Sequence, residues 1–139
     1  MNLSSRAGTY RVEVPFHDVD PARIVWHGHF YKYFEGARTE LMRLHDLDVP
    51  DIVEMGYGMV VTETRCRYVS PARYGDDLLV RATFQEATHR LVIGYSVENL
   101  TRDELSARGR TGLVAVTQSL EFLTSLPDPI VERLTEEES

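Results

Sequence analysis

Alternation of apolar and polar residues predicts an antiparallel sheet over most of this chain. Five stretches change character at nearly every position, which is the pattern of strands that bury one face and expose the other. They span residues 9–15, 59–69, 78–86, 91–100 and 105–123. The connections between the last four are short and rich in turn-forming residues, so we expect consecutive antiparallel pairing instead of parallel crossovers. Gly109 and Gly112 predict a bulge or kink within the last strand.

Residues 28–45 instead show helical periodicity, with apolar side chains every three or four positions. The apolar positions are Phe30, Tyr33, Phe34, Ala37, Leu41 and Leu44. Gly36 inside this helix indicates close packing against the sheet, and shorter helices are expected from Pro50 to Met55 and over residues 130–134. A single apolar helix next to a sheet must bury its stripe against one sheet face. The pattern therefore predicts an α+β domain in which a curved antiparallel sheet of about five strands wraps around one long helix.

The bulk composition is that of an ordinary globular domain. With 139 residues, 42% apolar and 27% charged, the chain is expected to fold as a single domain over 1–139, with loose ends at 1–8 and 135–139. The formal net charge of −7 argues against a nucleic-acid partner unless basic residues cluster. The arginines of the predicted strands alternate like exposed positions, and we find no such cluster. These arginines are Arg65, Arg67, Arg108 and Arg110.

The cysteine count and the hydropathy pattern favour a cytoplasmic protein without a membrane span. Cys66 is the only cysteine, which excludes an intrachain disulfide and a zinc site built from several cysteines. Residues 1–8 are polar and lack the apolar core of a secretory signal. No stretch approaches the roughly 18 consecutive apolar residues that a membrane-spanning helix needs.

Candidate chemistry is concentrated just before the long helix. A polar loop carries Asp18 and Asp20 and is followed, after Trp26, by His27 and Gly28 at the predicted helix start. The first amides of a helix have no intrahelical acceptor and can stabilise a group that develops negative charge. A carboxylate beside them can attack a carbonyl carbon or deprotonate water. On residue type alone, an aspartate before proline also serves as a turn former, and a histidine here as a cap or packing residue.

The order of these residues resembles a known signature. The segment is similar to the motif of the hotdog-fold acyl-CoA thioesterases. It consists of Asp18-Val-Asp20, then Ile-Val-Trp-His ending at His27, then an aromatic-rich helix start. The closer resemblance is to the 4-hydroxybenzoyl-CoA thioesterase family and its branch encoded beside the bacterial Tol–Pal system. Residues 67–76 resemble a second landmark of that family, and the likeness extends over about residues 10–134.

The resemblance implies roles for the residues of this segment. Asp20 would be the catalytic carboxylate, acting as a nucleophile or as a general base. For Asp18, residue type favours a structural role, fixing the turn by hydrogen bonds with loop amides, over a direct part in catalysis. His27 would lie near the thioester carbonyl, where its imidazole, or its backbone N–H together with that of Gly28, would stabilise the oxyanion. Arg23 stands where many relatives have glycine, so we expect either a reshaped loop or a side chain that reaches substrate phosphates or Asp18.

The resemblance also implies the substrate and the assembly. Coenzyme A would be part of an acyl-CoA substrate, and no bound cofactor is expected. Arg90, in a turn between two predicted strands, would contact the phosphates of coenzyme A, with a solvated surface arginine as the alternative. No metal site is expected, because the histidines and aspartates between residues 17 and 29 match no known metal-binding spacing. A homodimer or homotetramer with active sites at the subunit boundary is expected, since sheet edges need cover.

The predicted reaction is thus hydrolysis of an acyl-CoA thioester, with two alternatives open. One is a hydratase or dehydratase on the same fold, and the other is a protein that binds acyl-CoA or acyl carrier protein without catalysis. The sequence lacks a Gly-x-Ser-x-Gly elbow and a glycine-rich phosphate loop, which argues against serine-triad hydrolysis and nucleotide-driven chemistry. The acyl group is left open, and the acidic surface argues only mildly against an acidic carrier protein as the substrate.

Overall fold

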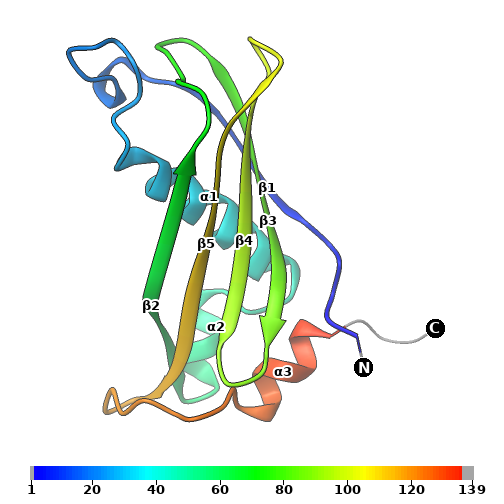
Figure 1. The fold of residues 1–139 in the computed structure, drawn as a ribbon. Helices are drawn as coiled ribbons and strands as arrows, with labels where there is room; N and C mark the ends of the chain where they lie inside the picture. The colour runs from blue at the N-terminus through cyan, green and yellow to red at the C-terminus, as the bar shows by residue number, and fades with distance from the viewer. Residues whose placement is uncertain (1, 136–139) are drawn as a thin grey trace.

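A computed structural model describes residues 2–135 of the chain. Its strands form one antiparallel sheet in the order β1-β3-β4-β5-β2, with one long helix and two short ones (Figure 1). The strands are β1 (Gly8–Glu13), β2 (Tyr57–Tyr68), β3 (Asp77–Ala87), β4 (Leu91–Asn99) and β5 (Glu104–Thr117). The helices are α1 (His29–Leu44), α2 (Val49–Glu54) and α3 (Asp128–Leu134), and a 3-10 turn spans Phe16–Asp18. The predicted α+β hotdog architecture is therefore confirmed.

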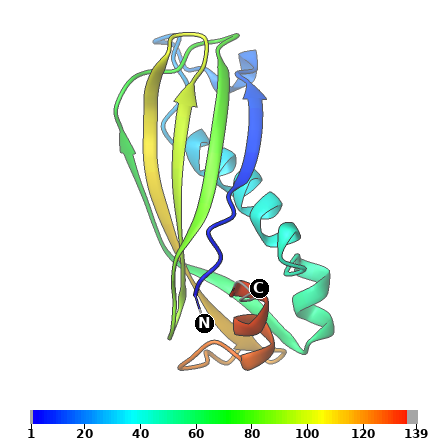
Figure 2. The same ribbon diagram turned by 90° about the vertical axis from the view of Figure 1, so that its right-hand side faces the viewer.

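The sheet curves around α1, which lies across one of its faces (Figures 1 and 2). The apolar stripe of α1 is buried from Phe30 to Leu41, and it packs on strand residues of the same core. These strand residues include Val80, Ala82, Ile93, Tyr95 and Val97. The ring of Phe34 stacks on that of Tyr95 with centroids 4.5 Å apart. Leu44, the last residue of α1, is 41% exposed, so the buried stripe is shorter than the periodicity predicts.

Three glycines, Gly8, Gly36 and Gly109, allow α1 to approach the sheet this closely. A Cβ built on Gly36 would lie 2.7 Å from the Tyr10 ring of β1, which confirms the close packing predicted from the sequence. A Cβ on Gly109 of β5 would lie 2.4 Å from the Phe34 ring.

The pairing of β5 continues through Gly109 without a shift, but the register shifts on either side of it. Against β2 the extra residue is Thr62, between the pairs Val61–Leu113 and Glu63–Gly112. Against β4 the extra residue is Ser106, between the pairs Val97–Ala107 and Glu98–Leu105, so the irregularity predicted within β5 is present but lies before Gly109.

Both ends of the described chain pack against the rest of the domain. Ser4 N–H donates to the carbonyl of Leu134 (2.8 Å), and Leu3 forms an isolated bridge with Thr135. These contacts differ from the loose N-terminal arm expected from the sequence. The loose tail expected at the other end falls mainly on residues 136–139, which lie outside the described residues.

The sheet has two free edges, β1 and β2. β1 is short and lies against α1, whereas β2 runs for 12 residues and most of the side chains in its second half are exposed. An unpaired edge of this length offers a row of backbone donors and acceptors to another strand. The sheet is therefore covered by α1 near its β1 edge, whereas its β2 edge is left uncovered along the second half of the strand.

Replacing Gly109 with alanine is expected to lower the free energy of unfolding by about 2 kcal/mol, because the added methyl group must displace the Phe34 ring and the backbone carbonyl of Arg65. Gly112→Ala on the same strand is the matched control, since its nearest neighbour is the flexible Arg90 side chain at 3.1 Å. Urea denaturation measures both variants. Equal stability of the two would show that the fold does not depend on this close approach.

Candidate active site

The loop before α1 is folded into a tight turn that presents Asp20. Asp20 N–H donates to the carbonyl of Ile24 (2.9 Å), and Arg23 N–H donates to the carbonyl of Asp20 (2.8 Å). The carboxylate Oδ1 accepts from Ala22 N–H (2.8 Å), so Asp20 does serve as the turn former considered from the sequence. Among residues 2–135, Oδ2 has no hydrogen-bond partner, which leaves it available to a substrate.

Asp20 lines a pocket of about 360 Å³, a volume within the range of small-ligand sites. Its walls come from the loop between residues 20 and 27, from Phe30 of α1, and from residues 68–71 after and at the end of β2. The polar side chains of this pocket are Asp20, His27, Tyr68 and Ser70. The structure therefore brings the two predicted catalytic residues, Asp20 and His27, to the same pocket.

The two residues predicted to supply oxyanion amides lie just before α1, and of these His27 lines the Asp20 pocket whereas Gly28 does not. Among residues 2–135, neither His27 N–H nor Gly28 N–H donates to an acceptor, and the N-cap Gly28 brings no side-chain hydrogen bond. The His27 carbonyl is held by Tyr68 Oη (3.1 Å) and by Phe30 N–H (3.3 Å), which orients the peptide group between His27 and Gly28. Sequence reasoning missed Tyr68. Tyr68 is 46% exposed; its partial desolvation and its neighbours Cys66 and Tyr31 raise its pKa, which keeps the hydroxyl a donor.

A buried carboxylate ties this loop to α1. Asp18 is 1% exposed, and its two oxygens accept hydrogen bonds from Lys32 Nζ and Tyr33 Oη, both at 2.6 Å. Burial alone would raise the pKa of Asp18, but the hydrogen bonds from Lys32 and Tyr33 outweigh it and lower the pKa. His29 Nδ1 lies 3.8 Å from the same carboxylate. The Asp18 side chain thus holds the loop through side chains of α1, not through the loop amides expected from the sequence.

Arg23 adopts the left-handed backbone conformation, with φ 69°. For a residue with a Cβ this conformation costs roughly 1–2 kcal/mol, and the turn around Asp20 keeps its hydrogen bonds despite the strain. The Arg23 side chain is exposed and forms no ion pair with Asp18 or with any other residue between 2 and 135. The loop therefore accommodates Arg23 without losing its turn. Of the two contacts expected for this side chain, the ion pair with Asp18 is not formed, and contact with substrate phosphates stays a prediction.

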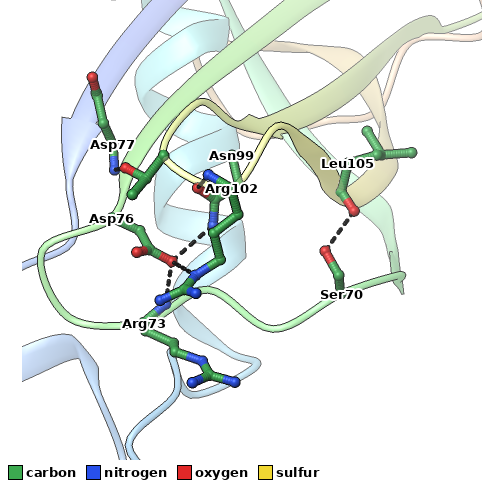
Figure 3. A network of polar contacts seen from close by, with 8 residues as sticks. Ser70, Arg73, Asp76, Asp77, Asn99, Arg102 and Leu105 are labelled. Atoms are coloured by element: carbon green, nitrogen blue, oxygen red, sulfur yellow. Dashed lines mark hydrogen bonds and ion pairs between the residues drawn. The ribbon is translucent and has the colours of Figure 1, made fainter.

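A second buried carboxylate fixes the segment that forms the opposite wall of the pocket (Figure 3). Asp76 is 2% exposed, and its Oδ2 accepts hydrogen bonds from Asn99 Nδ2 (2.8 Å), Arg102 Nε (2.9 Å) and Arg73 N–H (2.9 Å). Burial would raise the pKa of Asp76, but these hydrogen bonds, led by that of Arg102, lower it. The sequence gives no local signal for this cluster, because Asn99 and Arg102 lie in a different hairpin from Asp76.

The same segment is joined to β5 and to the Asp20 loop. Ser70 Oγ donates to the carbonyl of Leu105 in β5 (2.7 Å; Figure 3). Val25 N–H of the loop donates to the carbonyl of Ala72 (2.8 Å). Both walls of the pocket are therefore connected to each other and to the sheet.

Arg90 is not part of this pocket. It lies in the turn between β3 and β4, at the opposite end of the sheet from the loop before α1 (Figure 1). Its guanidinium pairs with Glu63 (3.2 Å) and Glu86 (3.6 Å), and its contact with coenzyme A stays a prediction.

Within residues 2–135, no group of three or more His, Cys, Asp or Glu side chains is placed to hold a metal ion, and no helix is long and apolar enough to span a membrane.

Comparison with known proteins identifies similar chains. Residues 23–106 match the family model described as the thioesterase superfamily. The chain is 28% identical over 125 residues to a putative esterase of Aquifex aeolicus, covering 90% of this chain and 95% of that protein. It is 26% identical over 123 residues to the 1,4-dihydroxy-2-naphthoyl-CoA hydrolase of Synechocystis, covering 87% and 89%.

The solved structures show the same architecture. A variant of 4-hydroxybenzoyl-CoA thioesterase bound to 4-hydroxybenzoyl-CoA is similar with a TM-score of 0.82 at 22% identity, covering 94% of this chain and 100% of that one. This likeness shows the fold. Placement in the Tol–Pal-associated branch stays a prediction.

Tyr33→Phe is expected to lower the free energy of unfolding by about 2 kcal/mol, because it removes a hydrogen bond to the buried, charged Asp18. Tyr74→Phe is the matched control, since Tyr74 is 63% exposed. Denaturant-induced unfolding followed by circular dichroism measures both. A loss in Tyr33→Phe no larger than that in Tyr74→Phe would mean that Lys32 alone holds Asp18.

The lowered pKa values of Asp18 and Asp76 are expected to make the fold less stable in acid. Such a carboxyl group stabilises the fold fully above its unfolded pKa of about 3.9, and this contribution is lost as the pH falls through the lower folded pKa. Asp76→Asn is expected to be less stable than the wild type at neutral pH and to lose less stability on acidification below about pH 4. Urea titrations across this range measure the slopes. Equal slopes for wild type and variant would contradict the assignment.

Proposed function

Because the chain belongs to the thioesterase superfamily, we propose that it hydrolyses the thioester bond of an acyl-coenzyme A to a free acid and coenzyme A. The observation that carries the proposal is that Asp20 and His27 line the same pocket. Among the described residues, Asp20 Oδ2 accepts no hydrogen bond and the His27 N–H, just before α1, donates none. The names of the relatives support the substrate class, since one is a hydrolase of an acyl-CoA and another was solved with an acyl-CoA bound.

Asp20 is the proposed catalytic carboxylate, by one of two routes. In the first, Oδ2 attacks the carbonyl carbon and the carbon–sulfur bond breaks, so that the leaving thiolate takes a proton from water. The resulting mixed anhydride is hydrolysed by water, which releases the acid and restores Asp20. In the second, Asp20 takes a proton from a water molecule as this water attacks, and then returns the proton to the thiolate that leaves. Both routes consume one water for each thioester.

The start of α1 is the proposed oxyanion site. In both routes the carbonyl oxygen becomes negatively charged when the carbon is attacked, and the free N–H groups of His27 and Gly28 would donate to it at the positive end of the helix. The imidazole of His27, exposed beside the pocket, is the alternative donor. These roles differ in one respect: the backbone role would survive replacement of the histidine side chain, and the imidazole role would not.

The proposed assembly is a homodimer or homotetramer with the pocket at a subunit boundary. The long unpaired edge of β2 supports this, because pairing two such edges would complete both sheets. Tyr68, at the end of β2, lines the pocket, so a partner paired at this edge would lie close to the substrate. Arg23 and Arg90 are the proposed contacts to the coenzyme A phosphates in this assembly. The cytoplasmic location and the acyl group stay predictions from the sequence.

A hydratase or dehydratase on this fold would also use a carboxylate and a histidine, and a binding protein would use the same pocket without turnover. The match to the thioesterase superfamily favours hydrolysis over both alternatives. Measurement of turnover separates the three, because only hydrolysis releases a free thiol.

Release of free thiol from short aliphatic, long aliphatic and aromatic acyl-CoA esters tests the proposal. The wild type is expected to hydrolyse at least one class. Asp20→Asn is expected to lower kcat about 100-fold or more and to retain substrate binding, because it removes the nucleophile or base but keeps an oxygen for the turn.

Asp103→Asn, an exposed aspartate in the turn between β4 and β5, is the matched control and is expected to keep full activity. Two results would contradict the proposal: no turnover of any ester, or an Asp20→Asn variant as active as the wild type.

A further inference from the structure

Pairing of β2 with β5 brings four arginines together on one face of the sheet. Arg65 lies directly opposite Arg110, and Arg67 directly opposite Arg108. Gly109, which separates the two arginines of β5, faces α1, so the arginines point away from the helix. We name Arg65, Arg67, Arg108 and Arg110 the arginine quartet. The conclusion from the sequence that basic residues do not cluster is therefore wrong, because it considered each strand separately.

The quartet is poorly neutralised by the rest of the protein. Arg65 Nε lies 3.6 Å from Glu63, but the other oxygen of Glu63 already pairs with Arg90 at 3.2 Å. Within residues 2–135, the other three members form no ion pair. By contrast, Arg81 on β3 has Glu98 within 3.9 Å. Like charges directly opposite each other in a sheet are destabilising, so the quartet lowers the stability of the free protein.

The quartet also lines a pocket. This pocket has a volume of about 660 Å³, larger than the pocket of Asp20, and all four arginines contribute to it. Thr64 and Gln85 add neutral hydrogen-bonding groups, Tyr31 adds an aromatic ring, and no carboxylate of the described residues is among its walls. Guanidinium groups bind phosphate oxygens through paired N–H donors. The walls therefore suit a compact ligand with several negative charges.

A small ligand fits this site better than a long polyanion does. A nucleic-acid strand or an acidic protein surface would extend past the quartet onto a chain whose formal net charge is −7. A small phosphorylated molecule would instead meet mainly the four positive charges and the neutral groups around them.

We propose that the arginine quartet binds a ligand with two or more neighbouring phosphate groups. The 3′-phosphoadenosine diphosphate end of coenzyme A is one source of this chemistry, and this source rests on the function proposed above. Residues of the two pockets are neighbours in space, because Tyr68 of the Asp20 pocket interacts with Tyr31 and Cys66, which line the quartet pocket. A free polyphosphate that binds independently of the substrate is the other source.

Calorimetric titration with adenosine 3′,5′-bisphosphate and with inorganic pyrophosphate, at about 0.15 M salt, tests the proposal. The wild type is expected to bind at least one of them. The double variant Arg67→Gln/Arg108→Gln is expected to bind it about tenfold more weakly or worse, because two guanidinium forks are lost. Arg81→Gln, an exposed arginine on the same face that pairs with Glu98, is the matched control and is expected to bind as the wild type does.

Thermal unfolding of the double variant shows whether a loss of binding comes from misfolding. Its melting temperature is expected to equal or exceed that of the wild type, because the substitutions relieve repulsion between exposed like charges. A loss of phosphate binding in a variant of equal or higher stability supports a binding site over a merely structural role.

Kinetic comparison of an acyl-CoA with the matching acyl-pantetheine distinguishes the two sources. If the quartet holds the nucleotide end of the substrate, the double variant lowers the ratio of kcat/KM for the CoA ester to that for the pantetheine ester about tenfold. An unchanged ratio, together with lost phosphate binding, identifies an independent phosphate site and also supports the proposal.

Two outcomes would overturn it: no binding of either phosphate probe by the wild type, or equal binding by the wild type and the double variant. Because binding is measured without turnover, these outcomes are distinguishable from failure of the proposed hydrolysis.

Discussion

The buried charge of Asp18 is the interaction on which the candidate active site depends. In the loop before α1, Val25 is buried in the core and Val19 packs against it, but the largest side chains, Phe16 and Trp26, are 74% and 48% exposed. Hydrogen bonds from Lys32 and Tyr33 to Asp18 add to this limited apolar anchoring. Removing one partner of a buried charge is destabilising, because the remaining charge is left partly uncompensated. The position of Asp20 in the pocket thus depends on its own turn and on a second carboxylate, Asp18, which is itself buried.

Most of the fold could be predicted from the sequence, because each element buries one face and its apolar residues therefore recur with the period of a helix or a strand. The C-terminal end of β5 could not be predicted in this way. The strand ends at Thr117, where residues 117–121 turn back, and Phe122 then pairs with Val116. The apolar and polar alternation continues through this turn, so the sequence reads as one longer strand. Leu120 takes a positive φ of 64° in the turn, a conformation that leucine rarely adopts, so its residue type gives no sign of a turn.

The candidate site was predictable where it is local and not where it depends on packing. Asp20 and His27 are seven positions apart in one motif, and the resemblance was enough to place them together. The partners of Asp18 are on α1 and depend on how the helix crosses the loop. The arginine quartet depends on the register of β2 against β5, since a slip by one residue would send one strand's arginines to the other face.

The bridge between Leu3 and Thr135 places the two ends of the described chain side by side, next to α3 and away from the loop before α1 (Figures 1 and 2). The two ends could therefore be joined, and the chain opened elsewhere, without changing how the helices and strands are arranged. A short linker between the ends, with a new start in the exposed turn at residues 118–121, would give a circular permutant with the same sheet. Fusion partners attached at either end would extend away from the pocket of Asp20.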